Sequence, residues 1–195
     1  MAWYVVDGMD GCGKSTCADI ICDKLTREGR KVFMVTHPNQ GCLVGRLENA
    51  FLHKEGKLCK ILSTVFYILD VLRSLAIMGF YRKRYDDFIF VRYLMAVAYL
   101  PKGLQRKAYH AISRILPMPD DPILIDVDAE TSMKRILERG EDLEAFENPE
   151  DLRQVCESMR SLSDGWTVID NSLPMDQVKA LLEGHVEDVL RGRRP

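Results

Sequence analysis

The stretch Gly8-Met9-Asp10-Gly11-Cys12-Gly13-Lys14-Ser15 matches the pattern GxxxxGK[ST], in which x stands for any residue. An apolar run at residues 2–7 comes directly before it, and a helical pattern at residues 14–28 follows it. In this strand–loop–helix context the pattern forms a phosphate-binding loop, or P-loop. Glycines let the backbone approach phosphates, and successive N–H groups of the loop then point inward at the anion. The stretch therefore predicts a binding site for a nucleoside triphosphate.

The residues that close the loop have separate predicted roles. Lys14 neutralises the β- and γ-phosphates, and the hydroxyl group of Ser15 ligates Mg²⁺. The helix that begins near Lys14 directs its positive end at the same phosphates. We expect ATP contacts from the whole loop and from the residue after it, namely Gly8, Met9, Asp10, Gly11, Cys12, Gly13, Lys14, Ser15 and Thr16.

Apolar runs and helical patterns alternate along the rest of the chain. Strands are predicted at residues 2–7, 31–36, 87–91, 122–127 and 166–169. Helices are predicted at residues 14–28, 58–78, 130–139, 149–162 and 175–190. Strands separated by helices imply a five-stranded parallel sheet flanked by helices, which is the three-layer α/β fold of P-loop NTPases. Ligands of such sheets bind beyond the carboxyl ends of the strands.

Composition and charge argue against a general nucleic-acid-binding function. The chain has 195 residues, of which 47% are hydrophobic and 29% charged, and its net charge is −2. Nucleic-acid-binding domains usually carry a clear excess of positive charge. The basic clusters at residues 82–84 and 191–194 are more simply explained as solvated surface.

The sequence also argues against a membrane protein and for a cytoplasmic one. Residues 61–80 are apolar, but Asp70 and Arg73 interrupt them, which is costly in lipid. A buried helix, or a helix that packs against a second subunit, is the favoured interpretation. The first residues lack the pattern of a signal peptide. The six cysteines lack zinc-site spacing, so we expect reduced thiols.

Transfer of a phosphoryl group requires positive charge in addition to Lys14. Arginines usually supply it, because their forked donors match phosphate oxygens. Arg92 follows the third predicted strand, and Arg135 and Arg139 come just before a polar, acidic segment at residues 140–148. At the ligand end of the sheet these residues favour a kinase, so Lys14, Arg92, Arg135 and Arg139 are the predicted catalytic residues.

The chain shows no internal repeat and no domain boundary, so residues 1–195 are predicted to form a single P-loop kinase domain. The segment at residues 140–148 lies between two predicted helices. We expect it to act as a lid that closes over the site and excludes water.

These motifs resemble those of the thymidylate kinases, P-loop kinases that act on nucleoside monophosphates. The likeness extends over nearly the whole chain. The matching blocks are residues 7–16 (the family's EGxDGxGKST loop), Phe90-Val91-Arg92-Tyr93 with Ala98-Tyr99 (DRY…AY), residues 123–128 with Arg135 and Arg139 (fourth strand and start of the lid), Phe146-Glu147 (end of the lid) and residues 168–172 (fifth strand).

The resemblance implies that the γ-phosphoryl group of ATP is transferred to a nucleoside monophosphate, and dTMP is the expected acceptor. It also implies that Mg²⁺ bridges the phosphates. The family's loop acid, here Asp10, typically touches the sugar hydroxyl of the acceptor. Arg92 and Tyr99 fall in the family's substrate-binding segment. Family members usually pair through helices on one face, so a homodimer formed through the helix at residues 58–78 is expected.

The chain departs from the family pattern at three positions. Val91 replaces an acid that usually helps to order Mg²⁺ or the reacting phosphates, for which Asp86, Asp87, Asp126 and Asp128 are alternative carboxylates. His37 stands where the family has an arginine after the second strand, and it is either a phosphate contact or part of an ordinary loop or helix start. Ala145 replaces the arginine near the end of the lid.

The acceptor base has two candidate contacts, depending on how the helix at residues 58–78 aligns with the central helix of the family. In the family a Phe or Tyr on the long central helix stacks on thymine, and an Arg one turn later contacts its carbonyl. If Phe66 stacks, Asp70 occupies the base-reading position, where a carboxylate suits an exocyclic amine. In another register, Arg73 keeps the thymine contact. Equally open is the interpretation that Phe66 and Tyr67 are core residues and that Asp70 and Arg73 form an i,i+3 pair.

Two other functions are left open by the sequence. The residues at positions 37, 70 and 91 are compatible with a P-loop kinase for another nucleotide or small-molecule acceptor. Val91 is also compatible with a nucleotide-binding module that has little catalytic activity. Tight ATP binding without phosphoryl transfer to any acceptor would favour the latter.

Overall fold

The structure is a computed structural model, and it describes residues 1–39, 41, 43, 46, 57–140 and 148–192. The side chains of residues 57–64 are not described. Apart from its two end residues, the predicted lid at residues 140–148 lies outside the described residues, as do Ala145, Phe146 and Glu147.

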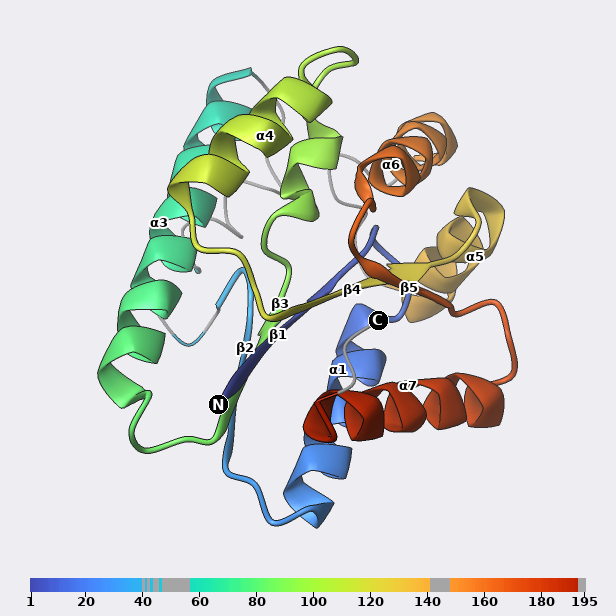
Figure 1. Cartoon of the computed structure of the whole chain (residues 1–195). Coiled ribbons are helices and arrows are strands. Elements are labelled where there is room, and N and C mark those ends of the chain that lie inside the picture. Colours follow the sequence, from blue (N-terminus) through green and yellow to red (C-terminus); the bar gives the residue numbers. More distant parts are fainter. Residues whose placement is uncertain (40, 42, 44–45, 47–56, 141–147, 193–195) are drawn as a thin grey trace.

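Five parallel strands form one sheet in the order β2-β3-β1-β4-β5 (Figure 1). The strands are β1 (Ala2–Asp7), β2 (Val32–Thr36), β3 (Asp87–Val91), β4 (Asp121–Asp126) and β5 (Thr167–Asp170). Two of them have the predicted bounds, and the other three differ by one residue. The predicted five-stranded α/β fold of the P-loop class is thereby confirmed.

Helices cover both faces of the sheet. They are α1 (Lys14–Arg27), α3 (Lys57–Tyr81), the 3₁₀ helix η1 (Met95–Tyr99), α4 (Gln105–Ile115), α5 (Ala129–Arg139), α6 (Pro149–Leu162) and α7 (Met175–Leu190). Helices α1 and α7 lie side by side on one face, whereas α4, α6 and η1 pack together on the other (Figure 1). The sequence analysis missed α4 and η1. In α4, Tyr109 is buried, and Ala108 and Ile112 are partly buried against the core, a short apolar stripe that the sequence analysis did not identify.

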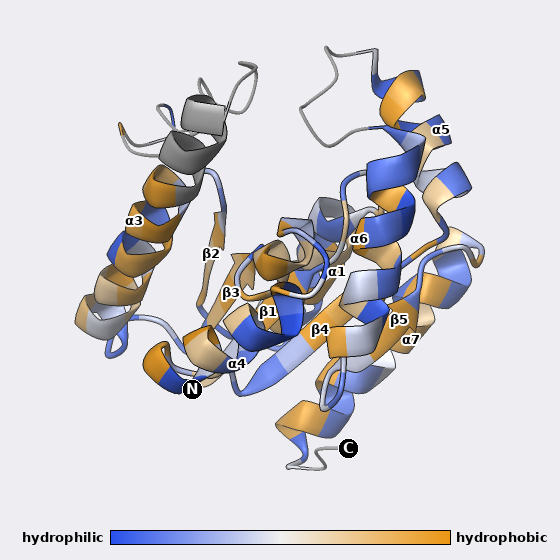
Figure 2. Cartoon of the chain, turned by 90° about the horizontal axis from the view of Figure 1, so that it is seen from above, coloured by the Kyte–Doolittle hydropathy of each residue, from blue (hydrophilic) through white to orange (hydrophobic). Residues whose placement is uncertain are grey.

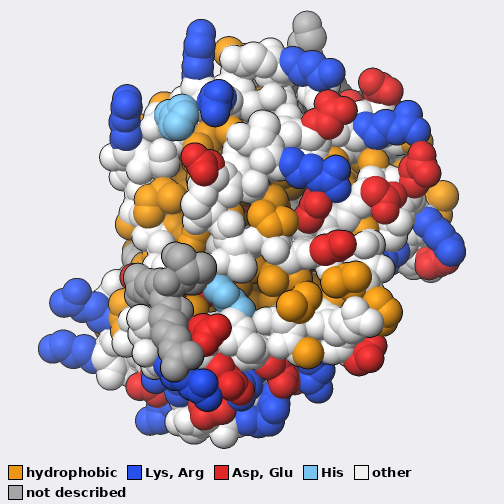
Figure 3. Space-filling view, turned by 45° about the vertical axis from the view of Figure 1, so that its right-hand side comes forward, with side chains coloured by type: hydrophobic (Ala, Val, Ile, Leu, Met, Phe, Trp, Pro, Cys, Tyr) orange, Lys and Arg blue, Asp and Glu red, His pale blue; other side chains and the backbone are white. Residues whose placement is uncertain are grey.

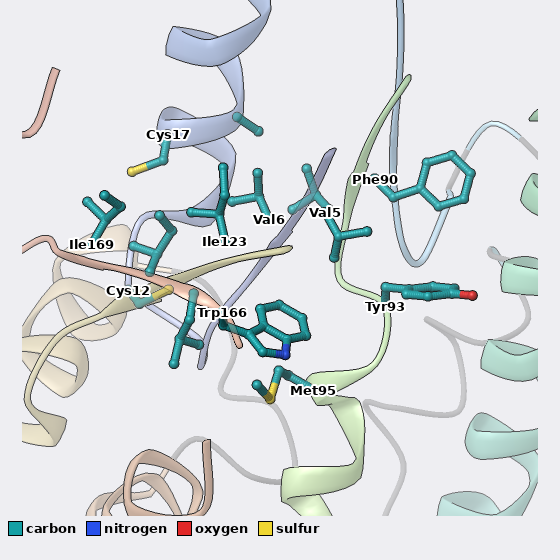
Figure 4. Packing of buried hydrophobic residues seen from close by; sticks show 14 of the residues in the cluster. Val5, Val6, Cys12, Cys17, Phe90, Tyr93, Met95, Ile123, Trp166 and Ile169 are labelled. Atoms are coloured by element: carbon teal, nitrogen blue, oxygen red, sulfur yellow. The ribbon is translucent and has the colours of Figure 1, made fainter. Parts of the chain in front are cut away.

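The central strands explain why the sheet forms. Every residue of β1 and of β3 is buried, as expected for parallel strands that are covered on both faces. Val5 and Val6 of β1 lie close to Ile123 of β4 in the core (Figure 4). The order of strands places the carboxyl ends of β1 and β3 next to each other, and these ends carry the P-loop and the turn that contains Arg92.

Side-chain hydrogen bonds connect elements and set the start of a helix. The indole N–H of Trp166, just before β5, donates to the hydroxyl group of Tyr109 in α4 at 2.8 Å. The Asp128 carboxylate caps α5 by accepting the N–H of Thr131 at 2.8 Å. This cap sets the start of α5 and therefore the place of Arg135 and Arg139 on that helix.

The surface carries charges of both signs. On the face shown in Figure 3, lysine and arginine side chains are interspersed with aspartate and glutamate side chains. Among the described residues, no helix has the length and apolar character needed to cross a membrane.

Candidate active site

The P-loop adopts a backbone shape that requires glycine. Gly13 has φ 91°, in the left-handed region, and a Cβ atom there would lie 2.4 Å from Nδ2 of Asn171. That side chain holds the loop from outside, because its Nδ2 donates to the Cys12 carbonyl at 2.6 Å. On the other side, the Ser132 hydroxyl donates to the Asp10 carbonyl. Residues of α5 and of the segment after β5 therefore fix the loop.

Helix α1 begins at the loop with an open first turn. It starts at Lys14, and its N-cap, Gly13, makes no side-chain hydrogen bond to the first turn. Backbone N–H groups of a first helical turn have no partner within the helix, so they are available to an anion. Ser15 and Thr16 are exposed at this end. The predicted phosphate contacts and the predicted Mg²⁺ ligand thus lie at one helix end.

Three predicted residues surround the carboxylate of Asp10, a residue that is only 4% exposed. Arg92 donates to Oδ1 of Asp10, and the Tyr99 hydroxyl donates to Oδ2 at 2.8 Å. The Lys14 ammonium lies 3.6 Å from Oδ1 and donates to the Met9 carbonyl at 2.6 Å. The loop, the turn after β3 and η1 therefore each supply a group to one buried charged cluster.

This cluster keeps Asp10 ionised. Burial alone would raise the pKa of Asp10, but the charges of Arg92 and Lys14 and the Tyr99 hydrogen bond lower that pKa to about 2. The charge of Arg139 acts in the same direction. An ionised carboxylate that already accepts from a hydroxyl group can accept a hydrogen bond from the sugar of an acceptor.

The Asp10 pKa predicts a loss of stability in acid. Because the folded-state pKa is below the ordinary value of 3.8, Asp10 stabilises the fold at neutral pH, and this contribution is lost as pH falls from about 5 to about 2. The shift corresponds to a free energy of unfolding on the order of 2 kcal/mol. Urea unfolding at about pH 7 and at about pH 3 would measure this effect. The free energy of unfolding should fall less between these two pH values for Asp10→Asn than for the wild type. An equal loss would contradict the assignment.

The two lid-side arginines lie on α5 beside the loop. Arg135 donates to the backbone carbonyl of Asn171 at 2.9 Å. Arg139 is exposed at the end of α5, and its charge lowers the pKa of Asp10. The structure therefore brings all four predicted catalytic residues, Lys14, Arg92, Arg135 and Arg139, to the P-loop end of the sheet.

Asp7 and Asn171 are site residues that the sequence analysis missed. Oδ2 of Asp7 accepts the N–H groups of Tyr93 at 2.9 Å and of Met95 at 3.0 Å, and the side chain is buried. Burial raises the pKa of Asp7 more than these two N–H groups and the nearby cations lower it. Both residues stand at the carboxyl end of a strand, and that position was the signal that could have identified them.

His37 does not have the predicted phosphate-contact geometry. It is fully buried, with Nδ1 2.9 Å from the Arg92 carbonyl oxygen and Nε2 2.9 Å from the Ser74 hydroxyl. Burial is the main cause of a lowered pKa, so the ring is neutral at physiological pH. This corrects the assignment of His37 as a cation for phosphate: both ring nitrogens are used within the protein.

The candidate base contacts of α3 have different surroundings in the structure. Asp70 is fully buried, accepts the backbone N–H of Asn39 at 2.7 Å and lies 3.9 Å from Nη1 of Arg73. Its predicted contact with a base is therefore wrong for this conformation, and the i,i+3 pair is present. Tyr67 is partly buried against the core, and its hydroxyl donates to the Tyr93 carbonyl at 2.6 Å. Phe66 is partly buried and Arg73 is exposed.

The four carboxylates proposed to replace the family acid at position 91 all have other contacts. Asp86 and Asp87 lie at the opposite end of β3, where they accept the backbone N–H groups of Lys31 at 2.8 Å and Ala2 at 2.9 Å. Asp126 accepts from Arg160 at 2.9 Å, and Asp128 caps α5. Val91 itself is buried and apolar. The carboxylate that pairs with Arg92 and Lys14 at the site is that of Asp10.

This arrangement defines a class of protein. P-loops occur both in enzymes that hydrolyse a nucleoside triphosphate and in enzymes that pass its γ-phosphoryl group to an acceptor. Arginines beside the loop, with a buried ionised carboxylate that can face an acceptor, favour the second group. The protein is a P-loop kinase.

Comparison with known families narrows this class. The family model for thymidylate kinase matches residues 6–182. The match covers most of the chain, so the protein belongs to the thymidylate kinase family, whose members are ATP-dependent phosphotransferases. The resemblance found in the sequence is thereby confirmed.

Archaeal proteins are among its relatives. The chain is 27% identical to a probable thymidylate kinase of Pyrobaculum aerophilum, over 98% of this chain and 99% of the relative. It is 27% identical to one of Archaeoglobus fulgidus, over 95% and 94% of the two chains. A third, from Thermoplasma acidophilum, is 32% identical over 78% and 79%.

Proposed function

We propose that this protein transfers the γ-phosphoryl group of ATP to a nucleoside monophosphate, with dTMP as the acceptor. One observation carries the proposal: Asp10 of the P-loop lies in contact with Arg92 and close to Lys14, at the carboxyl end of the sheet. Membership of the thymidylate kinase family supports dTMP as the acceptor, as do the printed names of the relatives.

The cluster suggests how charge is used during the reaction. Without nucleotide, Asp10 balances the charges of Lys14 and Arg92. When phosphates bind, the two cations turn toward them, and Asp10 becomes available to the sugar of the acceptor. Arg135 and Arg139 approach the transferring group from α5. These four cations then stabilise the negative charge on the oxygens of the γ-phosphoryl group, while that group passes in line from ATP to the acceptor.

The residues present fit a magnesium ion bound mainly by substrate. Mg²⁺ prefers oxygen ligands and is usually held by one or two protein groups together with phosphates and water. The exposed Ser15 hydroxyl at the start of α1 is such a ligand. Among the described residues, no cluster of His, Cys, Asp or Glu could hold a metal by itself. When bound, Mg²⁺ would neutralise charge on the β- and γ-phosphates.

A panel of acceptors tests this proposal. Purified protein would be incubated with ATP, Mg²⁺ and each nucleoside monophosphate in turn, while ADP release is followed, with Lys14→Ala as background. We expect release to depend on dTMP and on Lys14. Release with another acceptor would keep the kinase and change the substrate. ATP binding with background rates for every acceptor would support the nucleotide-binding module, for which buried Val91 is the main argument.

We also propose that the protein is a homodimer formed through α3. This helix lies at one side of the molecule (Figure 2). Val65, Ile68, Leu69 and Leu72 are 44–46% exposed, and Phe80 is 80% exposed. Their spacing places these five apolar side chains along one stripe of the helix. An exposed apolar stripe of this length is typical of an interaction surface.

The double variant Ile68→Asp/Leu72→Asp should convert the dimer into a monomer. Two charges on the stripe would have to be buried without partners in a dimer. Sedimentation velocity would compare it with Asp19→Asn, a change on the exposed side of α1. A wild type that sediments as a monomer at about 100 micromolar would contradict the proposed dimer.

We further propose that the whole chain acts as one kinase domain in the cytoplasm. The single sheet and the family match over residues 6–182 support one domain. The four cysteines whose side chains are described, Cys12, Cys17, Cys22 and Cys156, are free thiols, which fits a reducing compartment.

A further inference from the structure

The turn after β3 has an unusual backbone. Arg92 has φ 67°, and it is the only residue other than glycine with a positive φ in the part of the chain that the structure describes. An arginine in this region is strained, and such a conformation persists only where the surroundings fix it. The strain therefore directs attention to the groups that hold this turn.

His37 contacts the turn at two consecutive carbonyl groups. Its backbone N–H donates to the Val91 carbonyl at 3.0 Å, and its Nδ1 lies 2.9 Å from the Arg92 carbonyl oxygen. A carbonyl oxygen only accepts, so Nδ1 carries the proton of the neutral ring. Nε2 then accepts from the Ser74 hydroxyl of α3 at 2.9 Å. The tautomer and the ring orientation are thus both determined by neighbours.

Two further side chains bind the next residues of the turn. Oδ2 of Asp7 accepts the N–H groups of Tyr93 and Met95. The hydroxyl group of Tyr67, from α3, donates to the Tyr93 carbonyl at 2.6 Å. The backbone from position 91 to position 95 is therefore held from β1, from the end of β2 and from α3. The guanidinium of Arg92 extends from this turn to Asp10.

We propose that His37 is a positioning residue for phosphoryl transfer: its buried Nδ1–H holds the Arg92 carbonyl, and so fixes the strained turn that directs the Arg92 guanidinium to the phosphate site. Asp7 and Tyr67 complete the same clamp. The proposal deepens the proposed function and rests on it for its kinetic consequence. Small displacements of a charge-stabilising group have large effects on rate, because catalysis depends on geometry.

Two substitutions at position 37 distinguish the hydrogen bond of Nδ1 to Arg92 from the hydrogen bond of Nε2 to Ser74. Asparagine can place an amide donor near the position of Nδ1, whereas glutamine places its amide near Nε2. His37→Gln therefore loses the bond to Arg92 and can keep the one to Ser74. We expect His37→Gln to lower kcat between about tenfold and about a hundredfold, with KM for ATP changed by less than about threefold. His37→Asn should stay within about fivefold of wild-type kcat.

A double-mutant cycle distinguishes positioning from a general structural role. If His37 acts through Arg92, His37→Gln should lower kcat by less than about twofold when Arg92 is already alanine. A residue that only supports the fold would give the same loss in both backgrounds, and this additive result would overturn the proposal. Thermal unfolding of all four proteins would show which remain folded at the assay temperature.

Hydrogen exchange tests the clamp without requiring turnover. His37→Gln should speed exchange of the Arg92, Tyr93 and Met95 amides relative to His37→Asn, because the turn opens locally more often. Equal exchange in the two variants would overturn the clamp. If the wild type phosphorylates no acceptor, the proposed function fails, while the exchange comparison still decides whether His37 holds the turn.

Discussion

Lys14→Ala should lower kcat for phosphoryl transfer by about a thousandfold, the upper end of the loss expected when one preorganised charge-stabilising donor is removed. The Lys14 ammonium is the group of the P-loop that can reach the β- and γ-phosphates, and in the structure it is held by the Met9 carbonyl and by Asp10. Steady-state kinetics with saturating ATP and acceptor would measure the effect.

The control for Lys14→Ala is the conservative variant Lys14→Arg. Arginine keeps the charge but is larger and planar, and Lys14 is only 7% exposed. We expect Lys14→Arg to recover part of the lost rate. Thermal unfolding should show that both variants are folded at the assay temperature. Activity within about tenfold of wild type for folded Lys14→Ala would show that the loop does not carry the reaction.

Arg92→Ala should lower kcat by about a thousandfold or more, in the range found for arginines that stabilise a transferring phosphoryl group. Its guanidinium is the closest cation to Asp10, and Asp10 is the residue expected to meet the acceptor. KM for ATP should change little, because Lys14 and the loop amides bind the donor. Single-turnover kinetics would separate the chemical step from substrate binding.

Arg92→Lys is the matched variant for this prediction. Lysine keeps the charge but lacks the forked donors that match phosphate oxygens, so we expect an intermediate rate. In the alanine variant only, Asp10 would lose one of the cations that lower its pKa. If Arg92→Ala raised KM for ATP and left kcat unchanged, the residue would bind the donor and not stabilise the reacting group.

The sheet and the loop were predictable because their signals are local. The central strands are nearly continuous apolar runs, and the GxxxxGK[ST] pattern determines a loop and the start of a helix by itself. The arginines were predictable from their place after strands or near the lid. Parallel strands bring such positions to the same edge of the sheet.

The acceptor side was less predictable because it depends on tertiary contacts. Whether His37 meets phosphate or the Arg92 carbonyl is decided by burial, which the sequence of one loop does not reveal. Asp70 is likewise a possible base contact in the sequence alone. In the folded protein, its carboxylate accepts the backbone N–H of Asn39. Asp7 was overlooked because its hydrogen-bond partners lie 86 and 88 residues further along the chain.

The most direct test of the central claim follows the γ-phosphorus of ATP. Protein would be incubated with dTMP, Mg²⁺ and ATP labelled at that phosphorus, and the products would be separated by chromatography. We expect the label to appear in dTDP in amounts equal to the ADP formed, and to disappear from dTDP with Lys14→Ala. Label found only in inorganic phosphate, or still in ATP after prolonged incubation with folded wild-type protein, would contradict a thymidylate kinase activity.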